Sequence, residues 1–323
     1  MTRLILRTPG RLHFGLLSWG SKAPRQFGGV GLMVESPGLE LLAEPSETWR
    51  AEGPLAGRAL EVAARVAARL ADRGFPAGPA SLVIRKAPTE HVGLGVGTQL
   101  GLGVARLLCE MAGHTRPTVE ELAGLAGRGL RSGIGLHGFA LGGLVVDGGR
   151  RGPEGIPPLL ARLEFPEEWS VLLVIPRRGA GLHGLPEVRA FAELPPSPES
   201  LTDRLCRLVL LGLLPAVVER DLPRFGEALE EIQRRVGQGF APAQGGTFAR
   251  PELEAIADRL RAEGLQGVGQ SSWGPTLYGF SDAPLEGRRA LLGRLESRHG
   301  LGPGEVFWTP ASNRGATLDA PGD

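Results

Sequence analysis

Apolar and polar residues alternate near the start of the chain with the period of two that indicates a half-buried β-strand. Leu12, Phe14 and Leu16 fall on one face of this stretch, and Arg11 and His13 share the other. Pattern and turn residues together predict extended chain at 3–19, a turn and strand at 25–34, and strands at 39–43, 80–85, 142–147, 171–175, 266–269, 275–280 and 304–308.

Other stretches repeat their apolar residues every three or four positions, which is typical of amphipathic helices. In the first of them Val62, Val66 and Leu70 form such a stripe. Strands that come in runs with helices between them, without strict alternation, favour an α+β fold. The predicted helices are 55–73, a segment that begins near Thr98 and runs to about Gly113, 119–128, 198–219, 222–237, 251–263 and 288–298.

The composition changes near the middle of the chain. Residues 151–166 are rich in proline, glycine and charge, which is typical of a linker. We therefore predict two domains, 1–165 and 166–323, each long enough to bury a core. The last dozen residues have no periodic pattern, so we expect them to be loosely ordered.

A glycine-rich stretch, residues 91–101, stands before the second predicted helix. Gly93, Gly95 and Gly97 occupy alternate positions before Thr98 and Gln99. Backbone amides at a helix start attract anions, so this pattern indicates a phosphate site; a glycine turn without a ligand is equally consistent with it. The stretch lacks the Gly-Lys-Ser/Thr ending of a P-loop. The GxGxxG run at 133–138 has the wrong order of helix and strand for a dinucleotide site.

Charge and cysteine content narrow the function classes. The formal net charge is +1, which gives no indication of nucleic acid or a membrane surface as a partner. Cys109 and Cys206 lie in apolar helical patterns and are expected to be reduced thiols. Because no export signal is visible at the start of the sequence, we expect a cytoplasmic protein.

Three stretches resemble motifs of the GHMP superfamily, which includes galactokinase, homoserine kinase, mevalonate kinase and phosphomevalonate kinase. They are the N-terminal Pro-Gly-Arg-Leu-His-Phe-Gly-Leu at 9–16, the glycine loop and helix at 93–105, and Gly-Val-Gly-Gln-Ser-Ser-Trp-Gly-Pro at 267–275. Their order and spacing cover nearly the whole chain. The resemblance implies a two-domain fold, with an N-terminal ribosomal protein S5 domain 2-like domain and a C-terminal ferredoxin-like domain.

Two departures separate this chain from the GHMP kinases. The kinases usually have Ser-Ser where this chain has Thr98-Gln99, and several supply an aspartate base near the run at 131–139, which here contains no carboxylate. Asp147 lies beyond that run, on a predicted strand. A kinase needs a residue that accepts the hydroxyl proton or positions the nucleophile. Phosphorylation of a hydroxyl is therefore disfavoured, and an ATP-dependent small-molecule kinase is the alternative reading.

A non-kinase branch of the superfamily, the β-ribofuranosylaminobenzene 5′-phosphate synthases, fits better. The resemblance rests on five segments: residues 10–15, 91–99, 131–135, 142–149 and 269–275. It implies that phosphoribosyl pyrophosphate condenses with 4-aminobenzoate or 4-hydroxybenzoate, with loss of CO₂ and pyrophosphate, in the methanopterin pathway of C1 metabolism. The choice of aromatic acid stays open. A non-catalytic regulator that retains the fold is a third reading.

The resemblance and the residue chemistry together nominate site residues. Electrostatic stabilisation of a departing pyrophosphate needs amides, cations and Mg²⁺. The catalytic candidates are Arg11, His13 and Gln99, although a lone histidine is more often structural. The substrate- and phosphate-binding candidates are Gly93, Gly95, Gly97, Thr98, Arg25, Gln26, Arg177, His183, Gln270, Ser271, Ser272 and Trp273. For Arg25, Arg177, His183 and Trp273, a solvated or purely structural role is about as consistent with the sequence.

No set of histidine, cysteine and carboxylate residues has zinc-ligand spacing. Any metal should therefore be Mg²⁺ that arrives with the pyrophosphate group, and its protein ligands are not identified. The expected partners are the two small-molecule substrates. The apolar residues at 198–219 can bury against the sheet or against a second subunit, and the resemblance favours a homodimer.

Overall fold

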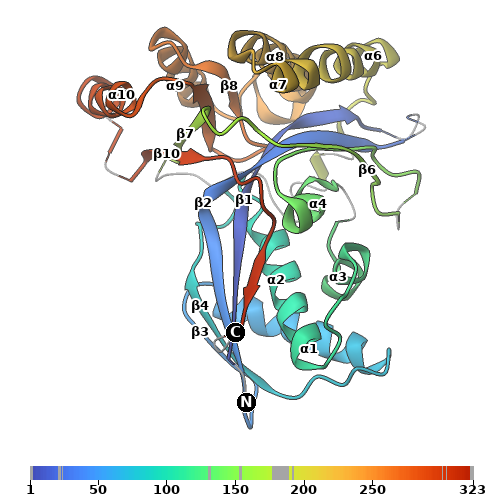
Figure 1. Cartoon of the computed structure of the whole chain (residues 1–323). Coiled ribbons are helices and arrows are strands. Elements are labelled where there is room, and N and C mark those ends of the chain that lie inside the picture. The colour runs from blue at the N-terminus through green and yellow to red at the C-terminus, as the bar shows by residue number, and fades with distance from the viewer. Residues whose placement is uncertain are drawn as a thin grey trace.

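The structure is a computed structural model that describes residues 3–20, 23, 25–129, 132–152, 155–176, 189–190, 193–299, 301–302 and 304–320. The described chain forms two β-sheets with helices packed against them, which is the predicted α+β class. The helices within residues 56–126 lie toward one end of the molecule and those within residues 199–299 toward the other, with the two long strands within residues 4–45 running between them (Figure 1).

The first sheet has seven strands, five of them in the order β11-β1-β2-β4-β3, and β5 pairs with both β2 and β6. Its centre is one long ribbon, because the stretches predicted as separate strands at 25–34 and 39–43 form a single strand, β2. The pairing of β1 with β2 is irregular between His13 and Gly15, where a bulge interrupts the register. The strands are β1 (Leu4–Ser18), β2 (Phe27–Pro45), β3 (Arg50–Glu52), β4 (Ala80–Lys86), β5 (Leu144–Asp147), β6 (Leu159–Leu163) and β11 (Thr317–Asp319).

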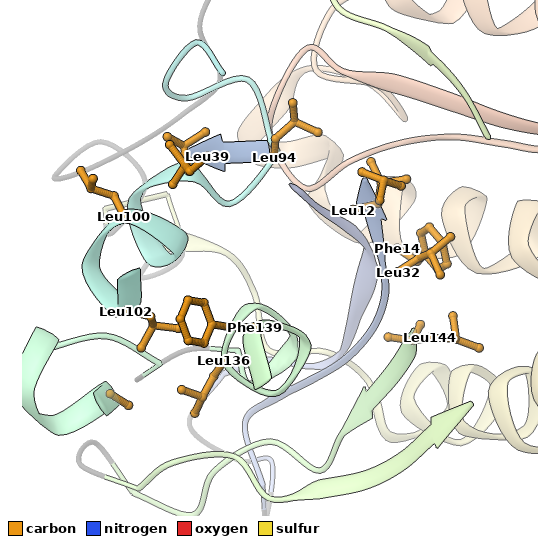
Figure 2. Close-up of a cluster of buried hydrophobic side chains, with 14 of the residues drawn as sticks. Leu12, Phe14, Leu32, Leu39, Leu94, Leu100, Leu102, Leu136, Phe139 and Leu144 are labelled. Carbon is orange, nitrogen blue, oxygen red and sulfur yellow. The ribbon is translucent and has the colours of Figure 1, made fainter. Parts of the chain in front are cut away.

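Among the described residues, four helices accompany the first sheet: α1 (Ala56–Ala71), α2 (Val96–Met111), α3 (Val119–Ala126) and α4 (Ile134–Leu141). The start of α3 is fixed by a capping box, in which Thr118 and Glu121 satisfy each other's backbone amides. Leu102 of α2 and Phe139 of α4 belong to the same buried cluster as the inward-facing residues of β1 and β2 (Figure 2). The GxGxxG run at 133–138 is therefore part of a packed helix.

The second sheet is antiparallel, with the order β10-β7-β9-β8. Numbered within this sheet the order is 4-1-3-2, with helices between the first and second strands and between the third and fourth, so the expected ferredoxin-like topology is confirmed. Its strands are β7 (Ser170–Val174), β8 (Gln266–Gln270), β9 (Leu277–Ser281) and β10 (Val306–Pro310). The helices are α6 (Glu199–Leu208), a π-helical segment η1 (Val209–Leu213), α7 (Leu214–Glu219), α8 (Leu222–Gln244), α9 (Pro251–Ala262) and α10 (Leu285–His299).

Two sequence predictions about connecting segments are wrong. The predicted linker contains β6, which pairs with β5 and extends the first sheet. The last dozen residues contain β11, which pairs with β1, so Leu318 lies opposite Leu6. The chain therefore returns to the first sheet after completing the second. The division at residue 165 stays a prediction.

Candidate functional site

Three segments that are far apart in the sequence meet beside β1. The Oγ atom of Ser271, in the turn between β8 and β9, donates a hydrogen bond to the carbonyl oxygen of Gly93 at 2.7 Å. The Oγ atom of Ser271 also accepts a hydrogen bond from the backbone N–H of His13 at 3.0 Å, and the backbone N–H of Ser272 donates to the carbonyl of His13 at 3.1 Å. Gly93 has φ +96°, and a Cβ there would meet the carbonyl oxygen of Ser271 at 2.3 Å. The N-terminal motif, the glycine loop and the C-terminal motif are thus one structural unit.

The start of α2 lies beside two arginines. Gly95 is the N-cap, with φ +72°, and a Cβ there would meet the Nε atom of Arg11 at 3.0 Å. A Cβ on Gly97 would meet the Nη2 atom of Arg58 at 2.5 Å, and Arg58 forms an ion pair with Glu90. The positive end of the helix dipole therefore has cationic side chains around it, which is an arrangement for holding an anion.

A cavity of about 340 Å³ opens between the two halves of the molecule. One wall comes from β1, α2 and the segment between α3 and α4, and the opposite wall comes from α8 and the turn after β8. The polar residues that line it are Arg11, His13, Thr98, Arg128, Ser132, Gln233, Gln244, Thr247, Gln270 and Ser272. The apolar lining is Phe14, Leu16, Phe27, Val236, Phe240 and Trp273, together with several glycines.

The charged residues that the structure places in the lining of this cavity are all positive. Arg11 and Arg128 line it, and among the residues that the structure describes no aspartate or glutamate does. Burial, and then the charge of Arg11, lower the pKa of His13 to about 3, so its imidazole is neutral near pH 7. The two arginines therefore dominate the field, and the cavity suits an anionic ligand.

His13 is connected to a buried carboxylate through a serine. Its Nε2 atom lies 3.1 Å from the Oγ atom of Ser132, and that Oγ donates to Oδ2 of Asp147 at 3.2 Å. The backbone N–H groups of Gly133 and Gly149 donate to Oδ2 and Oδ1 of Asp147 at 2.8 and 2.9 Å. Asp147 has 0% exposure, and burial raises the pKa of its carboxyl group while these hydrogen bonds oppose the rise.

Comparison with known folds agrees with this architecture. The profile of the family described as "GHMP kinases C terminal" matches residues 213–295. The structure of homoserine kinase from Cytophaga hutchinsonii superposes with a TM-score of 0.72 at 16% identity, over 98% of this chain and 97% of that one. Mevalonate diphosphate decarboxylase from Staphylococcus aureus superposes with a TM-score of 0.66 at 14% identity, over 99% and 98%. At these identities the neighbours show the fold alone.

Full-length relatives decide the family. Two archaeal proteins named beta-ribofuranosylphenol 5′-phosphate synthase are 36% and 34% identical to this chain. The first, from Archaeoglobus fulgidus, aligns over 98% of this chain and 99% of its own length. The second, from Methanothermobacter thermautotrophicus, aligns over 98% of each. This chain belongs to the beta-ribofuranosylphenol 5′-phosphate synthase family. The resemblance to that branch of the GHMP superfamily is therefore confirmed.

Six of the residues nominated from the sequence line the cavity of this family member: Arg11, His13, Thr98, Gln270, Ser272 and Trp273. The side chain of Gln270 is held in place by the backbone, because its Nε2 donates to the carbonyl of Ser272 and its Oε1 accepts from Ala249. Both nitrogens of His13 also have hydrogen-bond partners within the protein. The catalytic and binding roles of these residues stay predictions.

Other nominated residues lie outside the cavity lining. Gln99 is buried and donates from Nε2 to the carbonyl of Gly135 at 2.8 Å, which ties α2 to α4. Arg25 donates to the carbonyls of Gly148 and Gly149. Gly93, Gly95, Gly97 and Ser271 shape the junction beside the cavity, and Gln26 pairs through its backbone with Arg150. Arg177 and His183 are outside the described residues.

The sequence reasoning missed three residues that this site of the synthase family brings together. Arg128 enters the cavity from the segment after α3, where Gly127 and Gly129 on either side both have positive φ. This Gly-Arg-Gly pattern is a local signal of a turn that presents the arginine, and it could have identified Arg128 from the sequence. Ser132 and Asp147 lie in segments that carry the family resemblance but were not nominated, because their contact joins a loop to the end of β5.

Proposed function

We propose that this chain is a β-ribofuranosylphenol 5′-phosphate synthase that condenses phosphoribosyl pyrophosphate with 4-hydroxybenzoate and releases CO₂ and pyrophosphate. The name of the archaeal relatives specifies a phenol product, which favours 4-hydroxybenzoate over 4-aminobenzoate. The observation that carries the proposal is the cavity with two arginines and, among its described lining residues, no carboxylate.

Arg11 and Arg128 suit a donor that carries a phosphate and a diphosphate. Arginine binds such groups through charge-assisted, often bidentate hydrogen bonds. When the bond from ribose C1 to the diphosphate oxygen lengthens, negative charge grows on the leaving group, and fixed cations stabilise that transition state more than the ground state. The start of α2, beside Arg11 and Arg58, adds backbone amides to the same region.

The aromatic acid fits the opposite wall. The rings of Phe240 and Trp273 lie 5.2 Å apart at an interplanar angle of 36°, and both line the cavity. A benzoate ring held against this wall would face ribose C1 with its carbon para to the hydroxyl group. That carbon forms a bond to C1 as the bond to diphosphate breaks. The bond to the carboxylate then breaks, CO₂ leaves, and its electron pair restores the aromatic ring. Positioning of the two substrates is a large part of this catalysis.

The described residues do not fit a resident magnesium site. They contain no group of three or more histidine, cysteine, aspartate or glutamate residues that could hold a metal ion. The described cavity lining also lacks the carboxylates that usually anchor Mg²⁺. A magnesium ion would therefore enter as part of the phosphoribosyl pyrophosphate complex, that is, as part of the substrate.

The kinase alternative has weaker support. Phosphoryl transfer to an alcohol relies on a group that orients or deprotonates the nucleophile. Asp147, the carboxylate nearest in the hydrogen-bond network, is fully buried behind Ser132 and already accepts three hydrogen bonds. The structural neighbours that are kinases share the fold at less than 25% identity, which does not transfer their activity.

The deciding experiment uses carboxyl-labelled 4-hydroxybenzoate. Purified protein with phosphoribosyl pyrophosphate and Mg²⁺ should release labelled CO₂ and pyrophosphate in equal amounts, and omission of either substrate should abolish both. Parallel reactions contain 4-aminobenzoate, or ATP in place of phosphoribosyl pyrophosphate. Pyrophosphate without CO₂ would indicate hydrolysis or attack through nitrogen or oxygen. ADP formation would support the kinase, and ligand binding without any product would support the regulator.

The assembly and cellular location stay proposals. None of the described helices is both long and apolar enough to span a bilayer. The apolar side chains of Leu210, Leu211 and Val218 are 64%, 66% and 68% exposed, so they could pack against a second subunit in the homodimer that the family resemblance favours. Light scattering would test for this dimer. We propose a cytoplasmic location, in keeping with these small-molecule substrates.

A further inference from the structure

A continuous chain of side chains joins the substrate cavity to a buried carboxylate. It starts at His13 on β1, passes through Ser132 before α4, and ends at Asp147, the last residue of β5. His13 and Ser132 line the cavity, whereas Asp147 does not. Because Asp147 does not contact the cavity, any effect of Asp147 on the reaction must act through Ser132 and His13.

The hydrogen bonds of this chain have one consistent direction. The backbone N–H of Gly15 donates to Nδ1 of His13 at 3.2 Å, so a neutral imidazole must carry its proton on Nε2. That N–H donates to Oγ of Ser132 at 3.1 Å, and the Ser132 hydroxyl proton then points to Asp147. The other hydrogen bonds to Asp147 come from backbone amides, which can only donate. An ionised Asp147 satisfies every one of these bonds.

The surrounding backbone leaves little room for another arrangement. A Cβ on Gly133 would meet Cδ2 of His137 at 2.9 Å and Cβ of Asp147 at 3.1 Å. A Cβ on Gly29 would meet Nε2 of His13 at 3.1 Å. The register of β1 against β2 shifts between His13 and Gly15, and the Gly15 N–H donates to the imidazole at this irregularity. The network is therefore built into the strands and turns that carry it.

We propose that Asp147 is a positioning residue for the proposed reaction, which acts through Ser132 to fix the acceptor of the Nε2 proton and thereby the orientation of the neutral His13 ring in the cavity wall. The inference rests on the proposed function. Departure of diphosphate leaves positive charge on ribose C1 and its ring oxygen. An imidazolium in the wall would oppose that charge, whereas a neutral ring with both nitrogens occupied does not. His13 then shapes and insulates the site and does not transfer a proton.

The test combines kinetics with nitrogen NMR of histidine-labelled protein at pH 7.5. His13 is assigned by its loss in His13→Gln, since the chain has six histidines. The wild type should show His13 with a protonated Nε2 and an unprotonated Nδ1. Ser132→Ala and Asp147→Asn should leave Nδ1 unprotonated, because Gly15 still donates to it, but the Nε2 proton should exchange with water faster, because its acceptor is lost or loosened. Each should lower kcat about 10-fold or more, as expected for loss of a buried hydrogen bond, with KM for phosphoribosyl pyrophosphate changed by less than about two-fold.

Two further variants separate positioning from a general loss of stability. Ser132→Thr keeps the hydroxyl and should retain the His13 signature and most of kcat. Ser170→Ala removes a buried serine of β7 that pairs with Arg288 outside the cavity, and it should lower stability without changing kcat. Should Asp147→Asn fail to fold, Ser132→Ala and Ser132→Thr still decide the question.

Failure of this inference differs from failure of the proposed function. An inactive wild type overturns the function. An active wild type with His13 protonated on Nδ1, or a folded Ser132→Ala variant with wild-type kcat, overturns the positioning role alone.

Discussion

The hydroxyl of Ser271 donates a hydrogen bond to the carbonyl oxygen of Gly93, a residue 178 positions earlier in the chain. Because the same hydroxyl accepts the backbone N–H of His13, one fully buried oxygen connects the glycine loop to β1. The cavity is thus held together by a contact that neither half of the chain can make alone.

Replacement of Ser271 should therefore destabilise the protein. Ser271→Ala leaves the buried N–H of His13 and the partly buried carbonyl of Gly93 without this partner, which costs about 1–3 kcal/mol of unfolding free energy. Denaturant unfolding monitored by tryptophan fluorescence measures this directly. The matched control is Ser297→Ala on exposed α10, where the lost hydrogen bond to Gly293 should cost less than about 0.5 kcal/mol. Equal losses in the two variants would contradict the bridging role.

The glycine loop gives a second prediction. Gly93→Ala places a Cβ within 2.3 Å of a backbone oxygen at a positive φ, so the variant should lose about 2 kcal/mol or more, or fail to fold. Gly57 in the first turn of α1 has no atom within 4 Å of such a Cβ. Gly57→Ala should accordingly raise the free energy of unfolding by about 0.5–1 kcal/mol. Thermal and urea unfolding of the two variants measure these changes in unfolding free energy. A loss well below about 2 kcal/mol in Gly93→Ala would show that the loop can move away from Ser271.

Arg128 carries a kinetic prediction. Arg128→Gln should raise KM for phosphoribosyl pyrophosphate about 10- to 100-fold, because a hydrogen bond to a charged group is worth about 1.5–3 kcal/mol. KM for 4-hydroxybenzoate should change little, since that substrate is assigned to the opposite wall. Arg116→Gln, on the exposed segment before α3, is the charge-matched control and should leave both constants unchanged. If the two variants behave alike, Arg128 does not bind the donor.

His13 should make stability depend on pH. Its pKa falls from 6.5 to about 3 on folding, so between these values the unfolded chain binds a proton that the folded chain does not. His13 therefore leaves the free energy of unfolding unchanged above about pH 6.5 and lowers it as pH falls toward 3, by about 3 kcal/mol at pH 4.5. The raised pKa of Asp147 acts in the opposite sense. Comparison of wild type with His13→Gln at pH 7 and 4.5 isolates the histidine, and equal pH dependence in both would contradict its low pKa.

Much of the fold could be predicted because its elements carry their own patterns. The alternation in β1 and the apolar stripe of α1 are local, and both elements lie where they were expected. β11 was missed because Thr317 to Asp319 have no apolar repeat, and what holds them is the exposed edge of β1. Only the folded chain supplies that edge.

The site was predictable to the extent that its residues sit in contiguous motifs. Arg11, Thr98 and Ser272 were found in this way, and all three line the cavity. Gln99 was nominated for its place in a motif, but its side chain turns toward the backbone of α4. The pairing of Ser132 with Asp147 depends on the path of β5 across β2, which no local pattern encodes.

The pairing of β11 with β1 brings the two ends of the described chain together. Ile5 lies opposite Asp319, and the N and C marks fall near each other at the same end of the molecule (Figure 1). A short peptide could therefore join the termini, and new ends could be opened at the exposed turn around Gly74, where an added Cβ would meet no atom within 4 Å. Such a circular permutant would keep both sheets intact. A C-terminal truncation, by contrast, would strip the neighbour from the strand that carries Arg11 and His13.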